Sequence, residues 1–462
     1  MPEVFDVAVL GGGSGGYVGA IRAAQLGLRV IVVEEDKVGG TCLHKGCIPT
    51  KALLQTAALL DELHGAGRLG VRVDDFSLDH NAASRRKTEV VAQLHRGVEF
   101  LLRKHKVETV AARGRLAGPN LVVAGDREIA AEHVIVATGS RPRSLPGLEV
   151  DGSAVITSDE ALTLDRVPAS AVILGAGAIG VEFASLYRSF GAEVTLVEME
   201  DSLVPLEDHE VGAELERQFS ARGIRCLAGH RLDIASLQRN EGGIAVTVAR
   251  PGGPDERLQA ELLLVAVGRA PNVEAIGLET TAVQTAVTGV AVDASMRTAQ
   301  WGISAVGDVT GGFLLAHKAM HEGVVAAETI AGLPTQPVDS ERVPRTTYCT
   351  PQIGSLGLSE RQAQAAGHAV STGVFPFRGN ARALIWGEQG GFCKVVADAT
   401  TNDVLGVHFI GHEVTELIAG PALGALLEAT PFELARAIAP HPTLSEVLGE
   451  AALAVSGEAI HL

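Results

Sequence analysis

The chain has 462 residues, of which 46% are apolar and 20% are charged, a composition typical of folded globular proteins and not of disordered chains or coiled coils. The net charge is −17, from 38 Lys and Arg against 55 Asp and Glu, which argues against nucleic acid or an anionic membrane as a partner and is compatible with a basic protein partner. No apolar run reaches the roughly 18 residues of a membrane span, and the start Met1-Pro2-Glu3 has no basic segment or cleavage site, so we expect a cytoplasmic protein without membrane contact.

The beginning of the chain predicts a glycine-rich turn between a strand and a helix. The predicted order is strand, turn, helix and strand, over residues 4–10, 11–16, 17–26 and 29–33. Gly11, Gly13 and Gly16 form a GxGxxG motif, whose glycines allow a tight turn, close approach of a pyrophosphate and close packing of the helix on the strand. The phosphates would lie at the helix N-terminus, and Glu34, 18 residues after Gly16, is placed to accept hydrogen bonds from ribose hydroxyls.

Two of the five cysteines, Cys42 and Cys47, lie close together in the segment GGTCLHKGCIPTK. Pro49 suits the first turn of a helix that runs to about residue 63, so Cys47 would lie at a helix N-terminus, where a thiolate is favoured. The spacing allows a redox-active disulfide. Two buried thiols or half of a zinc site are the alternatives, although no second Cys/His pair at matching spacing appears. The remaining cysteines are expected to be core residues in strand-like surroundings: Cys226, Cys349 and Cys393.

The strand, turn and helix pattern recurs later in the chain. Gly175, Gly177 and Gly180 form a second GxGxxG motif between strands at residues 171–174 and 194–197, and Glu198 follows the second of these strands. The glycines and the acid are both displaced by 164 residues from the first copy (175 − 11 and 198 − 34). Two copies in register predict two bound dinucleotides, typically a flavin and a nicotinamide.

Glu198 also indicates which nicotinamide is bound. A carboxylate at this position accepts a hydrogen bond from the free 2′-hydroxyl of NAD and repels the 2′-phosphate of NADP. Glu200 and Asp201 add negative charge, and no arginine lies between residues 192 and 205. The sequence therefore predicts NAD rather than NADP.

Near the end of the chain, His441 stands between two prolines, and Glu446 follows five residues later. The prolines fix the backbone, and the carboxylate could orient the ring. A thiol–disulfide reaction needs a base to take the proton of the substrate thiol, which makes His441 a candidate for that role, with an ordinary structural histidine as the alternative. His408 and His412 have no metal partner in the sequence, so we read them as structural and expect no metal site.

With these motifs the sequence resembles the pyridine nucleotide–disulfide oxidoreductases, and among them the dihydrolipoamide dehydrogenases, along essentially the whole chain. The motifs that carry the resemblance are GGGSGGYVGAIRAAQLG, GGTCLHKGCIPTKALL, VIVATGSRP, GAGAIGVEFASLYRSFGAEVTLVE, VAVGRAPN, SAVGDVTGGFLLAHKAMHEG and APHPTLSE. The resemblance implies an α/β fold with two Rossmann-like dinucleotide-binding domains, a central domain that completes the FAD site and an α+β C-terminal dimer-interface domain. The implied boundaries are 1–148 for the FAD domain, 149–273 for the NAD domain, 274–343 for the central domain and 344–462 for the interface domain.

The resemblance also implies the positions that contact FAD and NAD. Asp308 matches an acid that binds the ribityl chain, and Lys51 and Glu182 match a pair placed near the flavin N5. The full implied set is Gly11, Gly13, Ser14, Gly15, Gly16, Glu34, Glu35, Gly40, Thr41, Cys42, Lys51, Gly114, Ala137, Thr138, Gly139, Asp308, Ala316, Gly175, Gly177, Ile179, Gly180, Glu182, Glu198 and Gly268.

The implied reaction is the oxidation of a dihydrolipoyl group with transfer of its electrons to NAD+. Cys42 would exchange with the substrate, Cys47 would contact FAD, and His441, oriented by Glu446, would be the base, supplied by the other subunit of a homodimer. The implied partners are the lipoyl domain, carried on another polypeptide, and the basic peripheral subunit-binding domain of a dihydrolipoyl acyltransferase. Acidic residues of the interface domain would dock the latter, with these candidates: Glu413, Glu416, Glu428 and Glu433.

The sequence departs from the commoner family pattern at two places. His44 and Lys45, between the cysteines, replace the commoner Asn-Val, and Ala439 replaces a histidine that many relatives carry. Glutathione reductase, an alternative within the family, uses NADP and carries arginines in the second nucleotide-binding unit that are absent here. A non-catalytic flavin-binding subunit is the alternative from another class of protein, and it has no need of both cysteines together with the histidine and its carboxylate.

Overall fold

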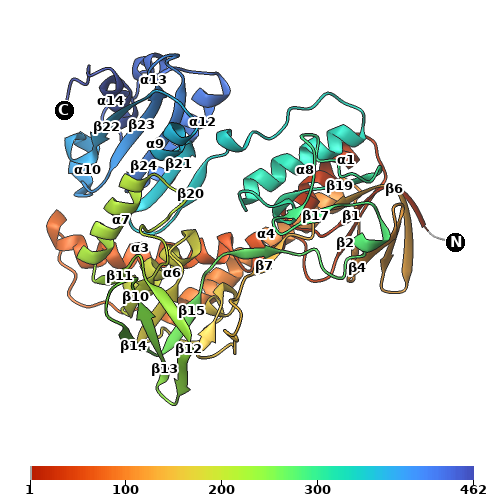
Figure 1. Cartoon of the computed structure of the whole chain (residues 1–462), viewed down its shortest axis with the longest axis horizontal. Coiled ribbons are helices and arrows are strands. Elements are labelled where there is room, and N and C mark those ends of the chain that lie inside the picture. Colours follow the sequence, from red (N-terminus) through yellow and green to blue (C-terminus); the bar gives the residue numbers. More distant parts are fainter. Residues whose placement is uncertain (1–2) are drawn as a thin grey trace. The chain divides into compact units, whose positions relative to one another are not determined.

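The structure is a computed structural model that describes residues 3–462, and its chain forms two compact units (Figure 1). Unit 1 comprises the described residues up to Ala52 together with Ser84–Pro142 and Arg269–Ser340, and unit 2 comprises Leu53–Ala83, Arg143–Gly268 and Glu341–Leu462. Each unit contains one of the two GxGxxG motifs. The four domain boundaries that the resemblance implies stay a prediction.

Unit 1 is built on a seven-stranded sheet whose strand order is β3-β2-β1-β6-β5-β4, with β19 pairing to β6. The pairs formed by β1, β2, β3, β6 and β19 are parallel, and β4 and β5 are antiparallel additions. The strands are β1 (Glu3–Leu10), β2 (Val30–Glu34), β3 (Glu108–Ala111), β4 (Gly114–Gly118), β5 (Leu121–Ala124), β6 (Arg127–Val136) and β19 (Ile303–Ala305). Two short pairs complete the unit: β7 (Ser140–Pro142) with β16 (Arg269–Pro271), and β17 (Thr285–Ala286) with β18 (Gly289–Val290).

Residues 7–10 of β1 and 30–33 of β2 are apolar without interruption because both faces of the sheet are covered there. On β1, Val7 and Val9 pack into one hydrophobic cluster, while Ala8 and Leu10 pack into another. A strand that is buried on both faces needs apolar side chains at every position, and a strand with one solvated face does not. The largely apolar run, interrupted by Asp6, predicted the strand at residues 4–10, and the structure places it at Glu3–Leu10.

Two helices of unit 1, α1 (Ser14–Gln25) and α8 (Ala316–Ile330), lie side by side (Figure 1). A Cβ atom at Gly323 would collide with the backbone of Gly15, and one at Gly19 would lie 3.0 Å from the oxygen of Gly323, so these glycines allow the backbones to touch. Further along, Arg22 pairs with Glu328 at 2.7 Å. Because the contacts advance in the same direction along both helices, the two N-termini lie at the same end.

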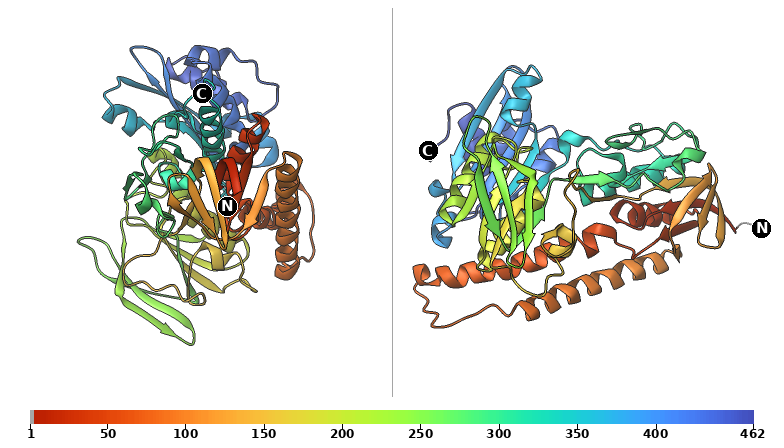
Figure 2. Two further views of the ribbon diagram at one scale, coloured as in Figure 1. Left: turned by 90° about the vertical axis from the view of Figure 1, so that its right-hand side faces the viewer. Right: turned by 60° about the horizontal axis from the view of Figure 1, so that its bottom comes forward.

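Unit 2 begins with a parallel five-stranded sheet of order β11-β10-β9-β15-β8. An antiparallel three-stranded sheet follows it, and Figure 2 shows this ribbon extending away from the parallel sheet of the same unit. A turn at residues 251–254 joins two of its strands. The strands are β8 (Val155–Ile156), β9 (Ser170–Leu174), β10 (Glu193–Val197), β11 (Ile224–Leu227), β12 (Arg231–Asn240), β13 (Gly243–Ala249), β14 (Glu256–Ala260) and β15 (Leu262–Val265).

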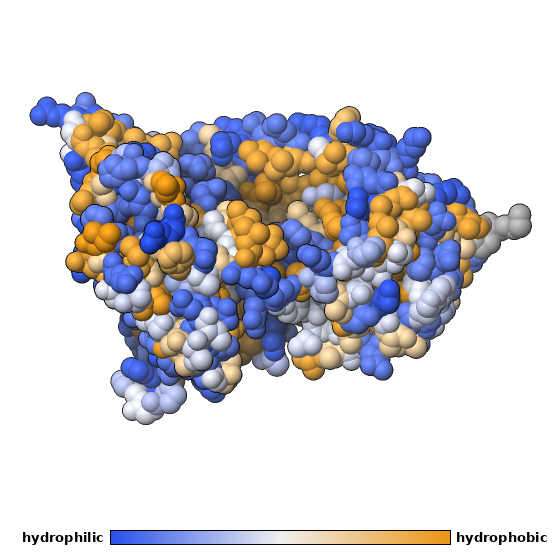
Figure 3. Space-filling view, turned by 90° about the horizontal axis from the view of Figure 1, so that it is seen from above, coloured by the Kyte–Doolittle hydropathy of each residue, from blue (hydrophilic) through white to orange (hydrophobic). Residues whose placement is uncertain are grey.

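The C-terminal part of unit 2 is an antiparallel five-stranded sheet of order β20-β21-β24-β23-β22. Helix α14 (Glu446–Val455) packs against β22 and β23, and Gly373 leaves room for its backbone. Figure 3 shows apolar side chains on the surface of this part of the chain, at the left of the view. The strands are β20 (Arg345–Thr347), β21 (Gln352–Gly357), β22 (Val370–Pro376), β23 (Phe392–Asp398) and β24 (Val404–Gly411).

The other α-helices precede, separate or follow these strands along the chain. They are α2 (Gly40–His44), α3 (Cys47–Gly65), α4 (His80–Lys104), α5 (Ser158–Ala161), α6 (Ala178–Ser189), α7 (His209–Ala221), α9 (Glu360–Ala365), α10 (Ala381–Trp386), α11 (Val414–Leu417), α12 (Ala419–Leu426) and α13 (Pro431–Arg436). Over residues 3–462, no helix is both long enough and apolar enough to span a bilayer. Cys349 and Cys393 are buried, as predicted for core residues, whereas Cys226 is only partly buried because β11 is an edge strand of its sheet.

Candidate functional site

The first glycine of each GxGxxG motif adopts a conformation that other residues avoid. Gly11 has φ +99° and Gly175 has φ +100°. A Cβ atom at Gly11 would collide with the carbonyl of Ala137, and one at Gly175 would lie 2.5 Å from the oxygen of Ala266. Both turns therefore require glycine for two reasons, the left-handed backbone and the close approach of a neighbouring strand end.

In each motif, the third glycine packs against the first, whereas the second lies next to open space. A Cβ atom at Gly16 or Gly180 would collide with the carbonyl of the first glycine of its own motif. In contrast, the nearest atom to a Cβ at Gly13 is 3.9 Å away, and nothing lies within 4 Å at Gly177. Helices α1 and α6 begin directly after these two open glycines, and neither has a side-chain cap. Each turn therefore offers open space and uncapped backbone N–H groups, which fits the pyrophosphate of a dinucleotide.

The acid that follows each unit also makes the same contacts in both copies. Glu34 accepts the backbone N–H of Gly12 at 2.7 Å, and Glu198 accepts that of Ala176 at 2.7 Å. The second oxygen of each carboxylate accepts the N–H of the residue two positions later, at 2.9 Å in both cases. Each acid thus ties the strand end to its glycine turn, in addition to the ribose contact that the spacing predicts.

In unit 1, the segment with Cys42 lies directly against the first glycine turn. The N–H of Gly39 donates to the oxygen of Gly12 at 2.8 Å, and a Cβ at Gly40 would lie 2.6 Å from the Cα of Gly13. Helix α2 carries Thr41 and Cys42, and α3 begins at Cys47, as predicted. This packing places the cysteine pair beside the turn that fits the first dinucleotide.

Cys42 and Cys47 are in contact as thiols, which is the reduced form of such a pair. The hydrogen bond with Cys47 raises the pKa of the Cys42 thiol, burial raises it further, and Lys51 lowers it in part. Cys47 lies at the first position of α3, where the backbone N–H groups favour a thiolate. Cys42 therefore holds its proton more tightly than an ordinary thiol.

Asp308 is held by two residues that the sequence analysis did not single out. The hydroxyl of Ser140 donates to its carboxylate at 2.5 Å, and Arg269 donates to the same hydroxyl at 2.7 Å while lying 3.9 Å from the carboxylate. The N–H of Gly307 donates to the buried Glu322, which pairs with Lys318 at 2.5 Å. Ser140 and Arg269 follow directly after the predicted Gly139 and Gly268 in the same motifs. Their position in these motifs could have identified them from the sequence.

The remaining predicted positions divide between the units. In unit 1, Thr138 and Asn272 exchange hydrogen bonds at 2.7 and 2.9 Å, Gly114 packs under Leu10, and Ala316 begins α8. In unit 2, Ile179 and Glu182 lie on α6, and the carboxylate of Glu182 accepts the N–H of Tyr348 at 2.9 Å. Unit 1 brings together these predicted positions: Gly11, Gly13, Ser14, Gly15, Gly16, Glu34, Glu35, Gly40, Thr41, Cys42, Cys47, Lys51, Gly114, Ala137, Thr138, Gly139, Asp308 and Ala316. Unit 2 holds the others: Gly175, Gly177, Ile179, Gly180, Glu182, Glu198, Gly268, His441 and Glu446.

His441 and Glu446 form the predicted contact in the C-terminal part of unit 2. The Nδ1 of His441 lies 2.8 Å from Glu446, whose other oxygen accepts the N–H of Thr443 at 2.9 Å. Burial alone would raise the pKa of Glu446, but these hydrogen bonds lower it, so the carboxylate is charged at neutral pH. Because Nδ1 donates to the carboxylate, Nε2 carries the lone pair and can accept a proton. Among residues 3–462, no cluster of His, Cys, Asp or Glu could hold a metal ion.

The chain matches one family of known proteins over nearly its whole length. The profile of the family described as pyridine nucleotide-disulphide oxidoreductase matches residues 5–323, and that of its dimerisation domain matches residues 343–452. The chain is 45% identical to a dihydrolipoyl dehydrogenase of Bacillus subtilis and 40% identical to one of Rhizobium etli, with 100% of each chain covered in both cases. The crystal structure of LpdA from Mycobacterium tuberculosis matches with a TM-score of 0.88 at 30% identity, covering 97% of this chain and 99% of that one. The flavoprotein disulfide reductase RclA from Escherichia coli, solved as a Cu(II) complex, matches with a TM-score of 0.86 at 25% identity over 98% and 99% of the two chains.

Proposed function

This chain belongs to the pyridine nucleotide–disulphide oxidoreductase family, and on that premise we propose that it is a dihydrolipoyl dehydrogenase that uses FAD and NAD+. The observation that carries the proposal is the contact between Cys42 and Cys47 beside the first dinucleotide turn. The direct test is NADH formation from dihydrolipoamide and NAD+ by the purified yellow protein. Two-electron reduction should also give a long-wavelength charge-transfer band, and a protein that forms no NADH would contradict the proposal.

The reaction transfers two electrons from the substrate dithiol to the cysteine pair in its disulfide form, and the two substrate protons go to His441 and Cys42. The first substrate thiol gives its proton to His441 Nε2 and attacks the sulfur of Cys42, which breaks the Cys42–Cys47 bond and leaves Cys47 as a thiolate. The second substrate thiol then attacks the mixed disulfide, which releases lipoamide and leaves Cys42 as a thiol. FAD, when bound, supplies the transfer of the two electrons to NAD+, giving NADH and a proton. Residues of the first turn and Asp308 would hold the flavin nucleotide, and those of the second turn would hold NAD+.

The preference for NAD+ over NADP+ can be tested with a matched control variant of the same chain. We expect NAD+ to be preferred over NADP+ by at least about a hundredfold in kcat/KM, roughly 2.7 kcal/mol, because the charge of Glu198 repels a 2′-phosphate. Glu198→Gln should reduce this preference at least about tenfold, measured by steady-state kinetics with both nucleotides. Glu34→Gln is the matched control, since Glu34 makes the same backbone contacts in the first motif, and it should leave the preference unchanged. Equal loss of preference in both variants would contradict the role of Glu198.

The chain forms a homodimer through its dimerisation domain, which carries apolar side chains on its surface (Figure 3). The exposed ones include Leu423, Leu426, Leu427, Phe432 and Ile438. We infer that His441 serves the cysteine pair of the other subunit, because the base and the cysteines lie in separate parts of the chain and the base lies in the domain that dimerises.

Exchange of subunits between two inactive variants tests this inference. Mixing a Cys42→Ser dimer with a His441→Gln dimer should restore activity, because each heterodimer then has one site with both defects and one site with neither. At complete random exchange, about a quarter of all sites should be intact, and lipoamide-dependent NADH formation should rise accordingly. Absence of any recovery, with exchange verified by mass spectrometry, would mean that both residues act within one subunit.

The partner of this enzyme is proposed from charge. The exposed Glu413, Glu416, Glu428 and Glu433 lie in the dimerisation domain of a chain whose net charge is −17. They suit a small basic domain, such as the peripheral subunit-binding domain of a dihydrolipoyl acyltransferase. A domain that straddles the two-fold axis can bind only once per dimer.

The binding stoichiometry and its salt dependence check the proposed partner. Titration calorimetry should give one small domain per enzyme dimer, with an affinity that falls at least about tenfold as salt rises from about 0.05 to 0.5 M. Two domains per dimer, or an affinity independent of salt, would rule out this docking. Apolar contacts at the axis would instead keep the affinity constant over this range.

A further inference from the structure

Two histidine rings converge on one backbone carbonyl, directly before the helix that carries Cys42. His44 Nε2 lies 3.0 Å from the oxygen of Val38, and His95 Nδ1 lies 3.0 Å from the same oxygen. The rings meet edge to face, with their centroids 5.0 Å apart. A carbonyl oxygen only accepts hydrogen bonds, so both of these nitrogens must carry a hydrogen. We refer to His44, His95 and the Val38 carbonyl as the histidine clamp.

The histidine clamp ties the helix that carries Cys42 to a much longer helix. His44 is the last residue of α2, two positions after Cys42, and His95 lies in the middle of α4. Helix α2 has only five residues, and its N-cap, Gly39, has no side-chain capping bond. A single helical turn is not stable by itself in water, so α2 depends on such tertiary contacts for its position. The clamp therefore helps to fix the sulfur of Cys42 relative to Cys47.

Burial, more than the surrounding charges, favours the neutral form of His44. Burial is the largest cause and lowers the pKa of His44. The hydrogen bond to the Val38 carbonyl and the charge of Asp36 raise the pKa, His95 and Lys37 lower it, and the net direction is downward. Asp36 is also engaged by Lys45 at 3.2 Å. On the α4 side, His95 Nε2 lies 3.4 Å from Glu99, which lies 3.9 Å from Arg103. A proton on His44 would thus place a charge on a partly buried ring beside Lys37.

We propose that His44 is a positioning residue for the Cys42–Cys47 pair, and that its imidazole, together with His95, holds α2 in the geometry that thiol–disulfide exchange requires. The proposal rests on the proposed function of the cysteine pair. Exchange needs the attacking sulfur in line with the bond that breaks, and an error of about 1 Å can cost up to a hundredfold in rate. Because burial acts against a charge on His44, protonation would favour a more exposed ring, which loosens the clamp and slows the exchange. Since the neutral form is favoured in the folded protein, this loss sets in as the pH falls below about 6.5, the ordinary value for histidine.

The first test separates exchange at the cysteines from reactions of the flavin alone. In stopped-flow experiments at pH 8, His44→Ala should reduce the rate of enzyme reduction by dihydrolipoamide by about ten- to a hundredfold. Reduction of ferricyanide by NADH, which does not require Cys42, should change by less than about twofold. His64→Gln is the matched control, because His64 also holds a backbone carbonyl, that of Leu60, through one ring nitrogen. It should change neither rate.

The second test uses a variant that keeps the donor but cannot titrate. His44→Gln places an amide N–H near the position of Nε2 and should recover at least about a third of the parent rate at pH 8. Between pH 8 and about 5.5, the parent should lose more of its exchange rate than His44→Gln does. His441 is present in both proteins, so the difference between the two profiles reports on His44. This comparison also decides the question if His44→Ala fails to fold.

Parent-like exchange in His44→Ala, or identical pH profiles in the parent and His44→Gln, would overturn the proposal. Failure of the wider function is recognised separately. If Cys42→Ser still oxidised dihydrolipoamide, the cysteine pair would not be the redox centre. If Cys42→Ser were inactive while the His44 variants matched the parent, only the role of His44 would be wrong.

Discussion

Cys42→Ser should lower the rate of dihydrolipoamide oxidation by at least about a thousandfold, because a serine cannot form the disulfide that accepts the substrate electrons. FAD should stay bound, since the change replaces one sulfur by oxygen and leaves both glycine turns and the Ser140–Arg269–Asp308 contacts intact. NADH-dependent reduction of ferricyanide should therefore persist within about twofold. The measurement is a pair of steady-state assays on the same yellow protein, one with dihydrolipoamide and one with ferricyanide.

Cys226→Ser is the matched control for this variant. Cys226 is also only partly buried, and it lies on the edge strand β11 in unit 2. Its burial raises the pKa of its thiol to about 12, so this thiol is unreactive at neutral pH and its loss should leave both assays unchanged. Lipoamide oxidation at the parent rate in Cys42→Ser would show that the pair is not the redox centre, and an equal loss in Cys226→Ser would show that the assay reports on folding.

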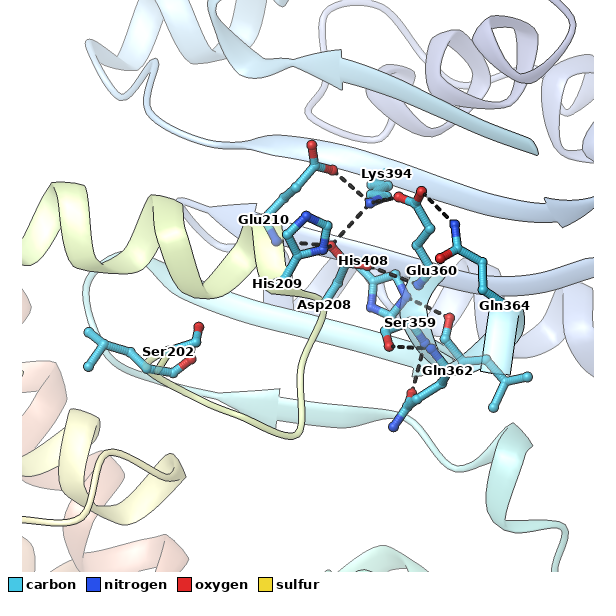
Figure 4. A network of polar contacts seen from close by, with 12 residues as sticks. Ser202, Asp208, His209, Glu210, Ser359, Glu360, Gln362, Gln364, Lys394 and His408 are labelled. Atoms are coloured by element: carbon cyan, nitrogen blue, oxygen red, sulfur yellow. Dashed lines mark hydrogen bonds and ion pairs between the residues drawn. The ribbon is translucent and has the colours of Figure 1, made fainter. Parts of the chain in front are cut away.

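The largest effect on stability is expected at a buried lysine in unit 2. Lys394 on β23 lies 3.1 Å from Asp208, 2.7 Å from Glu210 and 2.7 Å from Glu360 (Figure 4). Asp208 is fully buried, caps α7 through the N–H of Glu210, and accepts the N–H of Glu360 at 3.0 Å. Burial acts against charge on both groups, yet the carboxylates raise the pKa of Lys394, and the backbone donors together with His408 and Lys394 lower that of Asp208.

Lys394→Met should reduce the free energy of unfolding by about 3–5 kcal/mol, because it leaves the carboxylate of Asp208 buried without its cation. Adding Asp208→Asn should recover at least half of this loss, since Asn also caps helices and carries no charge. Glu210 and Glu360 can turn to solvent, because their side chains are 46% and 29% exposed. The measurement is denaturant unfolding of the FAD-loaded protein at one fixed concentration.

The exposed pair of Arg225 and Glu256 provides the control. Arg225→Met removes a charge from an ion pair whose side chains are 50% and 39% exposed, and it should cost less than about 1 kcal/mol. Because the pKa of Asp208 is lowered in the folded state, its stabilisation is present above about pH 4 and is lost as the pH falls below that value. The difference in the free energy of unfolding between the parent and Asp208→Asn should therefore decrease as the pH falls through that range. Equal costs for Lys394→Met and Arg225→Met would refute the special role of the buried cluster.

The sequence by itself determined the features whose requirements are local. A GxGxxG turn needs glycine at three fixed positions, so both turns, their flanking strands and their acids could be placed from spacing alone. The acids of the two copies, which are 164 residues apart, make the same backbone contacts in the structure. Pro49 placed the start of α3 near Cys47 for the same reason, because proline at the beginning of a helix acts on its own turn. The resemblance to the family then predicted the catalytic residues as well.

Only the tertiary structure decided which distant residues meet. Ser140 contacts Asp308 across 168 residues and Arg269 across 129, and neither spacing has any periodicity that a sequence could reveal. His44 could be recognised as a departure from the commoner pattern, but its partner on α4 and the carbonyl that both rings share appear only in the folded chain. Likewise, Lys394 looks like any strand residue until the fold surrounds it with carboxylates from α7 and α9. Contacts of this kind depend on how helices and sheets pack, and packing is set by many weak interactions over the whole chain, which a local pattern does not record.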